Sequence, residues 1–358
     1  MLKKLTFLGI ETSCDETAAA VIQENDSGTA NILSNIVSSQ IEEHKEYGGI
    51  VPEIAARAHI ENIDFIIYKA LLESKFDLDK IDGIAATAGP GLIVCLNVGL
   101  NIGKSIAAFS KKPFIAVNHL EGHALSPGLE KKINFPYLLL LISGGHTQYL
   151  IVSDVDKYEQ LGTTIDDALG EAFDKTAKML DLGYPGGPNV EKYSKLGDGK
   201  FFKLPQPIIN KSGCNLSFAG LKTAVLRESK KTVGNEKLKF NLAASFQNTV
   251  NKILYKKTQE AMIQFLKKTG KKNSPFVIAG GVAANKTIRN NLKKVSEEMN
   301  FKAVFPDLKF CGDNAAMIAW AGIKRYKKKL INNIDFSAKS RWPLDSSAPY
   351  MKGPGLKL

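Results

Sequence analysis

The sequence predicts an α/β protein built from two duplicated lobes around a central cleft. Apolar strands at residues 5–10 and 18–22 flank a polar turn, and apolar strands at 137–142 and 149–152 flank a second polar turn. Each unit is followed by strands that run into glycine-rich turns and then into helices. Because these elements recur in the same order, we interpret the halves as a duplication whose turn-bearing ends face the cleft. The alternative is chance likeness, since α/β segments often reuse glycine turns.

The later segments of the two halves match as well. Gly89 lies 34 positions before His123, and Gly280 lies 33 positions before Asp313. The second half also carries about 60 extra residues, which indicates an insertion within 153–250. The matching strand and helix segments are 83–91 with 276–282, 100–109 with 286–299, and 114–117 with 303–305.

Three regions are expected along the chain. The first is an N-terminal lobe at 1–125, and the second is a C-terminal lobe at 126–325 that carries the insertion. The third, at 326–358, is a C-terminal helix and basic tail that pack back on the first lobe. Within the insertion, spacing and composition predict helices at 166–180, 191–196 and 240–265, and a rigid loop at 183–188.

The composition fits a globular protein with a large core. The 358 residues are 44% hydrophobic and 23% charged, which excludes disordered and collagen-like chains. No apolar run reaches the ~18 residues that span a bilayer. Glu11 and Asp15 interrupt the apolar N-terminal segment, so we expect no export. Four widely spaced cysteines without CxxC spacing indicate a reducing compartment, which predicts a cytoplasmic protein with no membrane partner.

The excess of basic residues predicts an anionic partner. The formal net charge is +12, and lysine and arginine are dense at 200–239 and 324–329. Nucleic acid is the first partner to consider for such a surface. The alternative is a lysine-rich face that is merely solvated.

A pair of histidines predicts a metal site. His119 and His123 are four residues apart, so a helix places both imidazoles on one face. The repeat places Asp313 opposite them as a natural third ligand. This set leaves positions open for water or substrate, and it suits either Zn²⁺ or Fe²⁺. Glu121 points elsewhere on such a helix, so the His-Glu-x-x-His pattern of zinc peptidases is absent. The alternative is two surface histidines.

The two polar turns are candidates for binding a phosphate. In the turn at 143–147, paired glycines allow backbone N–H groups to converge on an anion, although an ordinary Gly-Gly hairpin would read the same way. In the turn at 11–17, Thr12 and Ser13 could donate hydrogen bonds. Asp15 and Glu16 could orient a metal or act as a base, or they could cap a turn.

Two later segments could bind a nucleoside. Glycines at 280–281 allow a flat ring to approach the backbone, and the amide of Asn285 can donate and accept. Gly186 and Gly187, with Glu191, could lie over a ribose because a carboxylate binds adjacent hydroxyls well. A plain βα turn and a proline-flanked loop are the alternatives.

Taken together, these motifs resemble the TsaD family (also called Gcp or Kae-type proteins), the tRNA threonylcarbamoyladenosine synthases of the actin/sugar-kinase/Hsp70-like superfamily. The resemblance runs from Phe7 to Leu344, nearly the whole chain, and Arg341-Trp342-Pro343-Leu344 matches bacterial members. The other matching motifs are Gly9–Thr17, Gly48–Glu53, Asn118–His123, Ser143–Thr147, Glu171–Lys175, Tyr184–Pro188, Ser217–Lys222 and Asp313-Asn314.

The resemblance implies one divalent metal per subunit, Fe²⁺ or Zn²⁺, held by His119, His123 and Asp313. The catalytic groups that we expect are Asp15 and Glu16. The substrate contacts that the resemblance implies are Leu141, Ile142, Ser143, Gly144, Gly145, Asp174, Gly187, Glu191 and Asn285.

The implied activity is transfer of the threonylcarbamoyl group from threonylcarbamoyl-AMP to the exocyclic amine of adenosine 37 in tRNAs that read codons beginning with A. The products are N6-threonylcarbamoyladenosine (t6A) and AMP. The implied partners are tRNA, threonylcarbamoyl-AMP, a TsaB-like pseudo-paralogue and a TsaE-like ATPase. The alternatives are a metal-dependent glycoprotein endopeptidase, an ATP-binding sugar-kinase-like protein, or a scaffold that binds a partner through a helix at 50–72.

Overall fold

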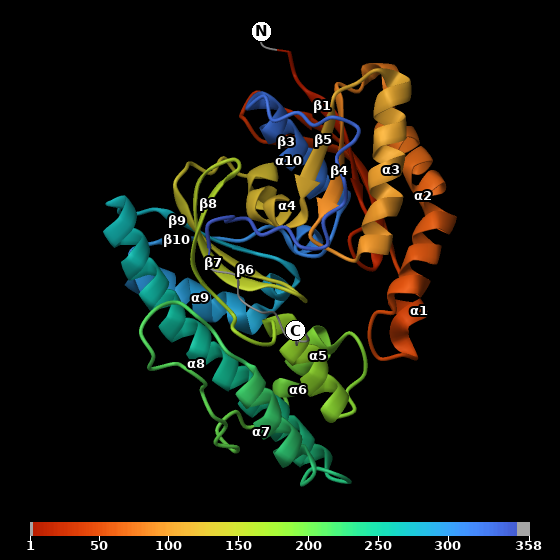
Figure 1. Cartoon of the computed structure of the whole chain (residues 1–358). Coiled ribbons are helices and arrows are strands. Elements are labelled where there is room, and N and C mark those ends of the chain that lie inside the picture. Colours follow the sequence, from red (N-terminus) through yellow and green to blue (C-terminus); the bar gives the residue numbers. More distant parts are fainter. Residues whose placement is uncertain (1–2, 349–358) are drawn as a thin grey trace. The chain divides into compact units, whose positions relative to one another are not determined.

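The computed structural model describes residues 3–348, which divide into two compact units (Figure 1). The first unit consists of residues 3–133, 154–157 and 306–346. The second consists of residues 134–153, 158–305 and 347–348.

The first unit contains a mixed five-stranded sheet in the order β3-β2-β1-β4-β5. β1 pairs antiparallel with β2 and parallel with β4, so that Gly9 lies opposite both Ala20 and Ala85. β2 continues antiparallel to β3, and β4 continues parallel to β5. The strand bounds are β1 Thr6–Glu11, β2 Glu16–Glu24, β3 Ala30–Ser39, β4 Gly83–Gly89 and β5 Phe114–Asn118.

Helices cover both faces of this sheet because side chains alternate along its strands. Phe7 packs with Met317 and Trp320 of α10, whereas the next residue, Leu8, packs with Ile63 of α2 on the opposite face. Figure 1 shows α2 and α3 side by side on one face of the sheet. The helices of this unit are α1 Ile41–Lys45, α2 Pro52–Ser74, α3 Ile93–Ser110, α4 His119–Leu125 and α10 Ala315–Lys327, with 3-10 turns at Leu78–Lys80, Ser126–Leu129 and Leu308–Phe310.

By length and composition, α3 is the one helix in the described part of the chain that could cross a membrane. The helix is not a continuous apolar run, because Asn97, Asn101 and Lys104 interrupt it, and it qualifies through its mean hydropathy. In this structure Leu100 and Ala107 of α3 pack into the core against the sheet. Core helices of soluble proteins pass the same test, so α3 is weak evidence for a span.

The second unit repeats the topology of the first, with its sheet in the order β10-β9-β6-β7-β8. β6 pairs antiparallel with β7 and parallel with β9, as β1 does with β2 and β4. This shared order confirms the predicted duplication. The strand bounds are β6 Tyr137–Ile142, β7 Thr147–Asp154, β8 Lys157–Thr163, β9 Pro275–Ala279 and β10 Lys302–Val304.

The insertion is helical, as predicted, but its details differ. β8 occupies the place of β3 in the repeat, so the extra residues begin after Thr163. α6 begins at Gly186, so part of the expected loop at 183–188 is helical; Pro188 is tolerated because the first turn of a helix needs no backbone donor. The helices are α5 Leu169–Met179, α6 Gly186–Ser194, α7 Ala219–Ser229, α8 Glu236–Thr269 and α9 Lys286–Glu298, with a 3-10 turn at Gly281–Ala284.

The C-terminal segment differs from the expected division at 326–358. The last described helix ends at Lys327, and residues 306–325, expected in the second lobe, belong to the first unit. After α10 the chain runs along β4 and β5 of that unit: the Asn332 N–H donates to the Phe114 carbonyl, and the Lys339 N–H donates to the Ala88 carbonyl. Residues 349–358 of the predicted basic tail lie outside the described residues.

Candidate functional site

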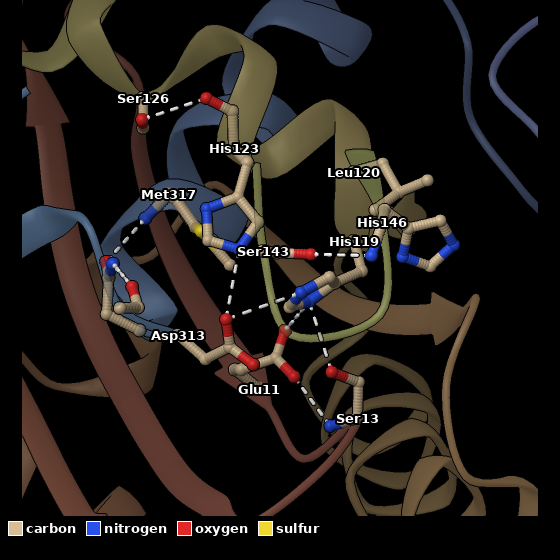
Figure 2. A network of polar contacts seen from close by, with 12 residues as sticks. Glu11, Ser13, His119, Leu120, His123, Ser126, Ser143, His146, Asp313 and Met317 are labelled. Atoms are coloured by element: carbon tan, nitrogen blue, oxygen red, sulfur yellow. Dashed lines mark hydrogen bonds and ion pairs between the residues drawn. The ribbon is translucent and has the colours of Figure 1, made fainter. Parts of the chain in front are cut away.

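Three side chains of the first unit converge as the sequence predicts for a metal site. Both histidines lie on α4, and Asp313 lies just before α10 (Figure 2). Asp313 Oδ1 is 3.0 Å from His123 Nε2 and 3.4 Å from His119 Nε2. One ligand atom from each residue lies within 4.8 Å of the others. The cluster is therefore compact enough for one cation to contact all three.

Local capping explains why α4 and α10 begin where these ligands need them. The Asn118 side chain accepts a hydrogen bond from the Leu120 N–H at 2.9 Å and so caps α4. The Asn314 side chain accepts from the Met317 N–H at 3.0 Å and caps α10. A Cβ at Gly122 would lie 2.9 Å from Ile318, so a glycine lets the two helices pack closely.

The charges of the cluster reinforce one another. Burial alone would raise the pKa of the Asp313 carboxyl, but the charge and hydrogen bonds of His119 and His123 hold it far below its usual range. Burial alone would lower the pKa of His119, but Asp313 and Glu11 raise it well above its usual value. The site thus favours a negatively charged Asp313 in contact with a positively charged His119. A divalent cation could compensate the charge of the same carboxylate.

The donor set fits a metal. Two imidazoles and one carboxylate match sites for Zn²⁺ and Fe²⁺, whereas Mg²⁺ prefers oxygen ligands. Nδ1 of the buried His123 has no hydrogen-bond partner among residues 3–348. A bond from Nε2 to a metal would hold this ring in place even though Nδ1 has no hydrogen bond there.

A buried carboxylate that the sequence analysis did not single out lies behind His119. Glu11 Oε2 is 3.1 Å from His119 Nδ1, and Ser13 Oγ is also 3.1 Å from that nitrogen (Figure 2). The signal in the sequence was the position of Glu11, a charged residue at the end of the buried, otherwise mostly apolar strand β1.

The turn that follows Glu11 carries the two expected catalytic carboxylates. Asp15 is 8% exposed, and Glu16, half-buried, begins β2. Burial is the main cause that raises the pKa of both carboxyls, and the charge of Asp313 adds to it. For Glu16 the pKa rises well above its usual range, and the hydrogen bond that protonated Glu16 donates to Asp15 contributes to the rise. A carboxylate with such a pKa is suited to accept a proton.

Thr12 has another role than the one suggested from the sequence. Its hydroxyl donates to the Cys95 carbonyl at 2.9 Å and accepts from the Gly99 N–H at 3.1 Å. Both partners belong to α3, so this hydroxyl ties the turn to the helix and is not free to donate to a phosphate.

Glu121 points away from the metal cluster, as predicted. Its Oε2 lies 2.6 Å from Arg325 Nη1 and its Oε1 accepts from the Asp156 N–H at 2.9 Å. The carboxylate is 1% exposed. It is therefore a buried structural group and has no access to a peptide substrate.

In the second unit, the turn between β6 and β7, which the sequence predicts as a candidate phosphate-binding turn, has open space beside its glycines. The Ser143 N–H donates to the His146 carbonyl, and the His146 N–H donates to Ser143 Oγ at 3.1 Å. A Cβ at Gly144 or Gly145 would meet nothing within 4 Å. The side chains of Leu141 and Ile142, by contrast, are fully buried in the core, which leaves only their backbone for substrate contact.

Two glycines fit other segments closely against this turn. A Cβ at Gly170, at the start of α5, would lie 2.7 Å from the Ser143 carbonyl oxygen. Gly280 has φ +95°, and a Cβ there would lie 2.5 Å from the Ile142 carbonyl oxygen. The structure thus brings the Ser143 turn and the segment leading to Asn285 together.

The remaining expected contacts also carry structural bonds. Asp174 Oδ1 accepts from the Gly186 N–H at 2.8 Å, next to Gly187, where a Cβ would meet nothing. Glu191 Oε1 accepts from the Lys286 N–H at 2.9 Å. Asn285 caps α9, and its Nδ2 donates to Gln247 Oε1 at 2.9 Å. Sequence reasoning missed Gln247, whose only signal is a polar side chain on the buried face of α8.

With this geometry established, comparison with known proteins identifies the family. A family model described as TsaD, tRNA N6-adenosine threonylcarbamoyltransferase, matches residues 31–320.

The chain belongs to the TsaD family. It is accordingly a transferase. A relative from Pelagibacter ubique (strain HTCC1062) is 58% identical over 100% of both chains. Relatives from Sinorhizobium medicae (strain WSM419) and Chelativorans sp. (strain BNC1) are 49% and 52% identical over 98% and 97% of both chains. All three are named tRNA N6-adenosine threonylcarbamoyltransferase.

Solved structures share the fold. Full-length HypF in a phosphate- and nucleotide-bound form aligns with a TM-score of 0.55 at 14% identity, over 92% of this chain and 47% of that one. T. kodakarensis HypF aligns with a TM-score of 0.56 at 12% identity, over 90% of this chain and 48% of that one. The fold of this chain, a mixed α/β fold with two sheets, is thus similar to that of both HypF structures.

Proposed function

We propose that this chain transfers the threonylcarbamoyl group of threonylcarbamoyl-AMP to the exocyclic amine of adenosine 37 in tRNAs that read codons beginning with A. The new bond joins N6 to the carbamoyl carbon, the bond from that carbon to the phosphate oxygen breaks, and AMP leaves. The observation that carries the proposal is the His119, His123 and Asp313 cluster in a member of this transferase family.

An aromatic amine is a poor nucleophile because its lone pair is delocalised into the ring, so positioning and polarisation must supply the catalysis. His119, His123 and Asp313 would hold one Fe²⁺ or Zn²⁺, which when bound supplies a Lewis acid for the acyl donor. We assign proton acceptance from N6, or positioning of that amine, to the Asp15 and Glu16 pair. The raised pKa of Glu16 supports this role, because it brings that carboxylate closer to the basicity needed near neutral pH.

The second unit would bind the adenylate. The open backbone at Gly144 and Gly145 supports a phosphate contact by the N–H groups of the Ser143 turn. Asp174, Gly187, Glu191 and Asn285 would contact the nucleoside. Glu191 and Asn285 already form hydrogen bonds within the protein. They would therefore contact the nucleoside through the lone pairs and N–H groups that these bonds leave free.

The tRNA would dock on exposed lysines of the segment 200–239. Lys200, Lys203 and Lys230 are exposed there. The second basic segment, 324–329, is a weaker choice because its lysines pair with carboxylates: Lys327 with Glu24 and Lys328 with Asp154. A basic surface that receives a single-stranded anticodon loop suits a target base that must be splayed outward.

A TsaB-like pseudo-paralogue and a TsaE-like ATPase would assist, in the cytoplasm. Ile60, Phe65, Tyr68 and Leu72 of α2 are each more than half exposed. Exposed apolar side chains gathered on one helix are typical of a protein interface, which supports a partner on α2.

A peptidase function is disfavoured because Glu121 is buried against Arg325 and cannot act as a general base. A kinase-like function is disfavoured because the metal ligands include two imidazoles.

Incubation with threonylcarbamoyl-AMP, tRNA and the partner proteins tests the proposal. We expect t6A in the tRNA and one AMP released per group transferred. The double substitution Asp15→Ala and Glu16→Ala should abolish transfer and leave the metal content unchanged. Full activity in that variant would remove these residues from the mechanism, and peptide cleavage without t6A formation would overturn the function.

A further inference from the structure

Both oxygens of the Glu11 carboxylate, which lies next to the candidate metal ligand His119, accept hydrogen bonds. Glu11 is the last residue of β1 and is fully buried. Its Oε1 accepts from the Ser13 N–H at 2.5 Å, and its Oε2 accepts from the Thr87 hydroxyl at 2.5 Å. The third contact is His119 Nδ1, 3.1 Å from Oε2.

The hydrogen bonds of Glu11 determine which nitrogen of His119 carries hydrogen. Both carboxylate oxygens accept from other donors, Oε1 from the Ser13 N–H and Oε2 from the Thr87 hydroxyl. A carboxylate that accepts on both oxygens has no hydrogen to donate, so His119 Nδ1 is the donor. In a neutral imidazole, a hydrogen on Nδ1 leaves the lone pair on Nε2. His119 Nε2 is the nitrogen that faces Asp313.

We propose that Glu11 is a positioning residue, which holds His119 with hydrogen on Nδ1 and so presents its Nε2 to the metal. The bonds from Thr87 and from Ser13 fix the carboxylate, and the carboxylate in turn fixes the ring; the contacts of Glu11 with Ser13 and His119 are visible in Figure 2. Carboxylates that accept from a metal-bound histidine orient the ring and raise its basicity. His123 has no such group, since its Nδ1 is without a partner among residues 3–348.

The two ligands on α4 are therefore unequal. Hydrogen bonds from the protein orient the ring of His119 through Nδ1 before any metal is bound, whereas the hydrogen bond of the His123 ring is the one from its Nε2 to Asp313, itself a ligand. Metal affinity should then depend on Glu11 even though Glu11 is not one of the three residues of the candidate metal cluster. This inference rests on the metal site of the proposed function.

The test compares wild-type protein with Glu11→Ala, Glu11→Gln and the control Glu24→Gln. Glu24 is also a buried carboxylate of the same sheet, but it pairs with Lys327. Zn²⁺ affinity is measured by competition with a chelator, and the ring N–H signal of His119 is recorded by ¹⁵N NMR of zinc-loaded protein. With five histidines in the chain, the ring signals are few enough to assign.

We expect Zn²⁺ affinity to fall about 10- to 100-fold in Glu11→Ala. Glu11→Gln should lose less, because an amide oxygen can still accept from Nδ1 without the charge. The His119 Nδ1–H signal should be strongly downfield and slow to exchange in wild-type protein and in Glu24→Gln, and it should be lost in Glu11→Ala. A structural role alone would not move this signal in a folded variant.

Wild-type affinity and an unchanged Nδ1–H signal in Glu11→Ala would overturn the proposal while leaving the metal site intact. If Glu11→Ala does not fold, wild-type Zn²⁺ affinity in Glu11→Gln would overturn it, because the loss of the charge should lower the affinity in that variant. Failure of wild-type protein to bind Zn²⁺ at all would instead contradict the metal site itself. An altered coordination number in the visible spectrum of the Co²⁺ form of Glu11→Gln would make Glu11 a ligand and also overturn the positioning role.

Discussion

The Glu121 carboxylate and the Arg325 guanidinium form an ion pair of 2.6 Å, with the two side chains only 1% and 7% exposed. Glu121 lies between the metal ligands His119 and His123 on α4, and Arg325 lies on α10, which follows Asp313. The pair thus links the two helices that bring the ligands together.

Arg325→Ala should destabilise the fold by about 3–5 kcal/mol, because it leaves the buried Glu121 carboxylate without its cation. Urea unfolding measures the change. The matched control is Lys327→Ala on the same helix, whose ion pair with Glu24 is half-exposed on the lysine side and should contribute less than about 1 kcal/mol. Equal stability of the two variants would contradict this role.

Gly9→Ala should destabilise the first unit by about 1–3 kcal/mol through overpacking. A Cβ at Gly9 would lie 2.4 Å from the carbonyl oxygen of Ala315 in α10, whereas a Cβ at Gly49 would meet nothing within 4 Å. Gly49→Ala is therefore the control, measured in the same unfolding experiment. If both substitutions are neutral, the close approach of β1 and α10 is not tight in solution.

Gly144→Ala separates substrate binding from folding. The added Cβ meets no protein atom, so the melting temperature should stay unchanged. If the N–H groups of this turn hold the adenylate phosphate, the KM for threonylcarbamoyl-AMP should rise about tenfold, which corresponds to ~1.4 kcal/mol. Gly170→Ala should instead lower the melting temperature, because its Cβ would collide with the Ser143 carbonyl oxygen. An unchanged KM in Gly144→Ala would argue against a phosphate contact there.

Glu16→Gln should change the pH dependence of stability in metal-free protein. Because the pKa of Glu16 is raised in the folded chain, the folded state keeps a proton that the unfolded chain loses above its ordinary value of about 4.3. Stability contributed by that proton is lost as pH rises from there through the raised pKa.

The uncharged Gln removes this loss, so the melting temperature of Glu16→Gln should rise relative to that of wild-type protein as the pH increases above about 4.3. Thermal melts in the presence of a chelator measure the difference at each pH. Glu42→Gln, on the exposed surface of α1, is the control. A difference that does not change with pH would show that Glu16 titrates alike in both states.

The sequence predicted strands whose residues are all buried, such as β1 and β6, because an apolar run between turn residues is a clear signal. It missed β3 and β8, which are edge strands with mixed polar and apolar side chains. Such strands owe their conformation to pairing with a neighbour, and pairing is not local in sequence.

The candidate site shows the same limit. The spacing of His119 and His123 and the position of Asp313 in the repeat predicted the metal ligands. Glu11 and Arg325 were missed because their roles depend on partners 108 and 204 positions away. The role of such a residue depends on a partner that only tertiary packing places next to it. The pattern of neighbouring residues in the sequence therefore carries no information about that role.

Threonylcarbamoyl transfer should require the metal that we propose for His119, His123 and Asp313. The most direct measurement is metal content per chain together with t6A formation, for wild-type protein, His123→Ala and the exposed control Asp335→Asn. We predict one Fe²⁺ or Zn²⁺ per chain and full activity in wild-type protein and the control, and loss of both in a folded His123→Ala. Undiminished t6A formation by metal-free His123→Ala would contradict the account.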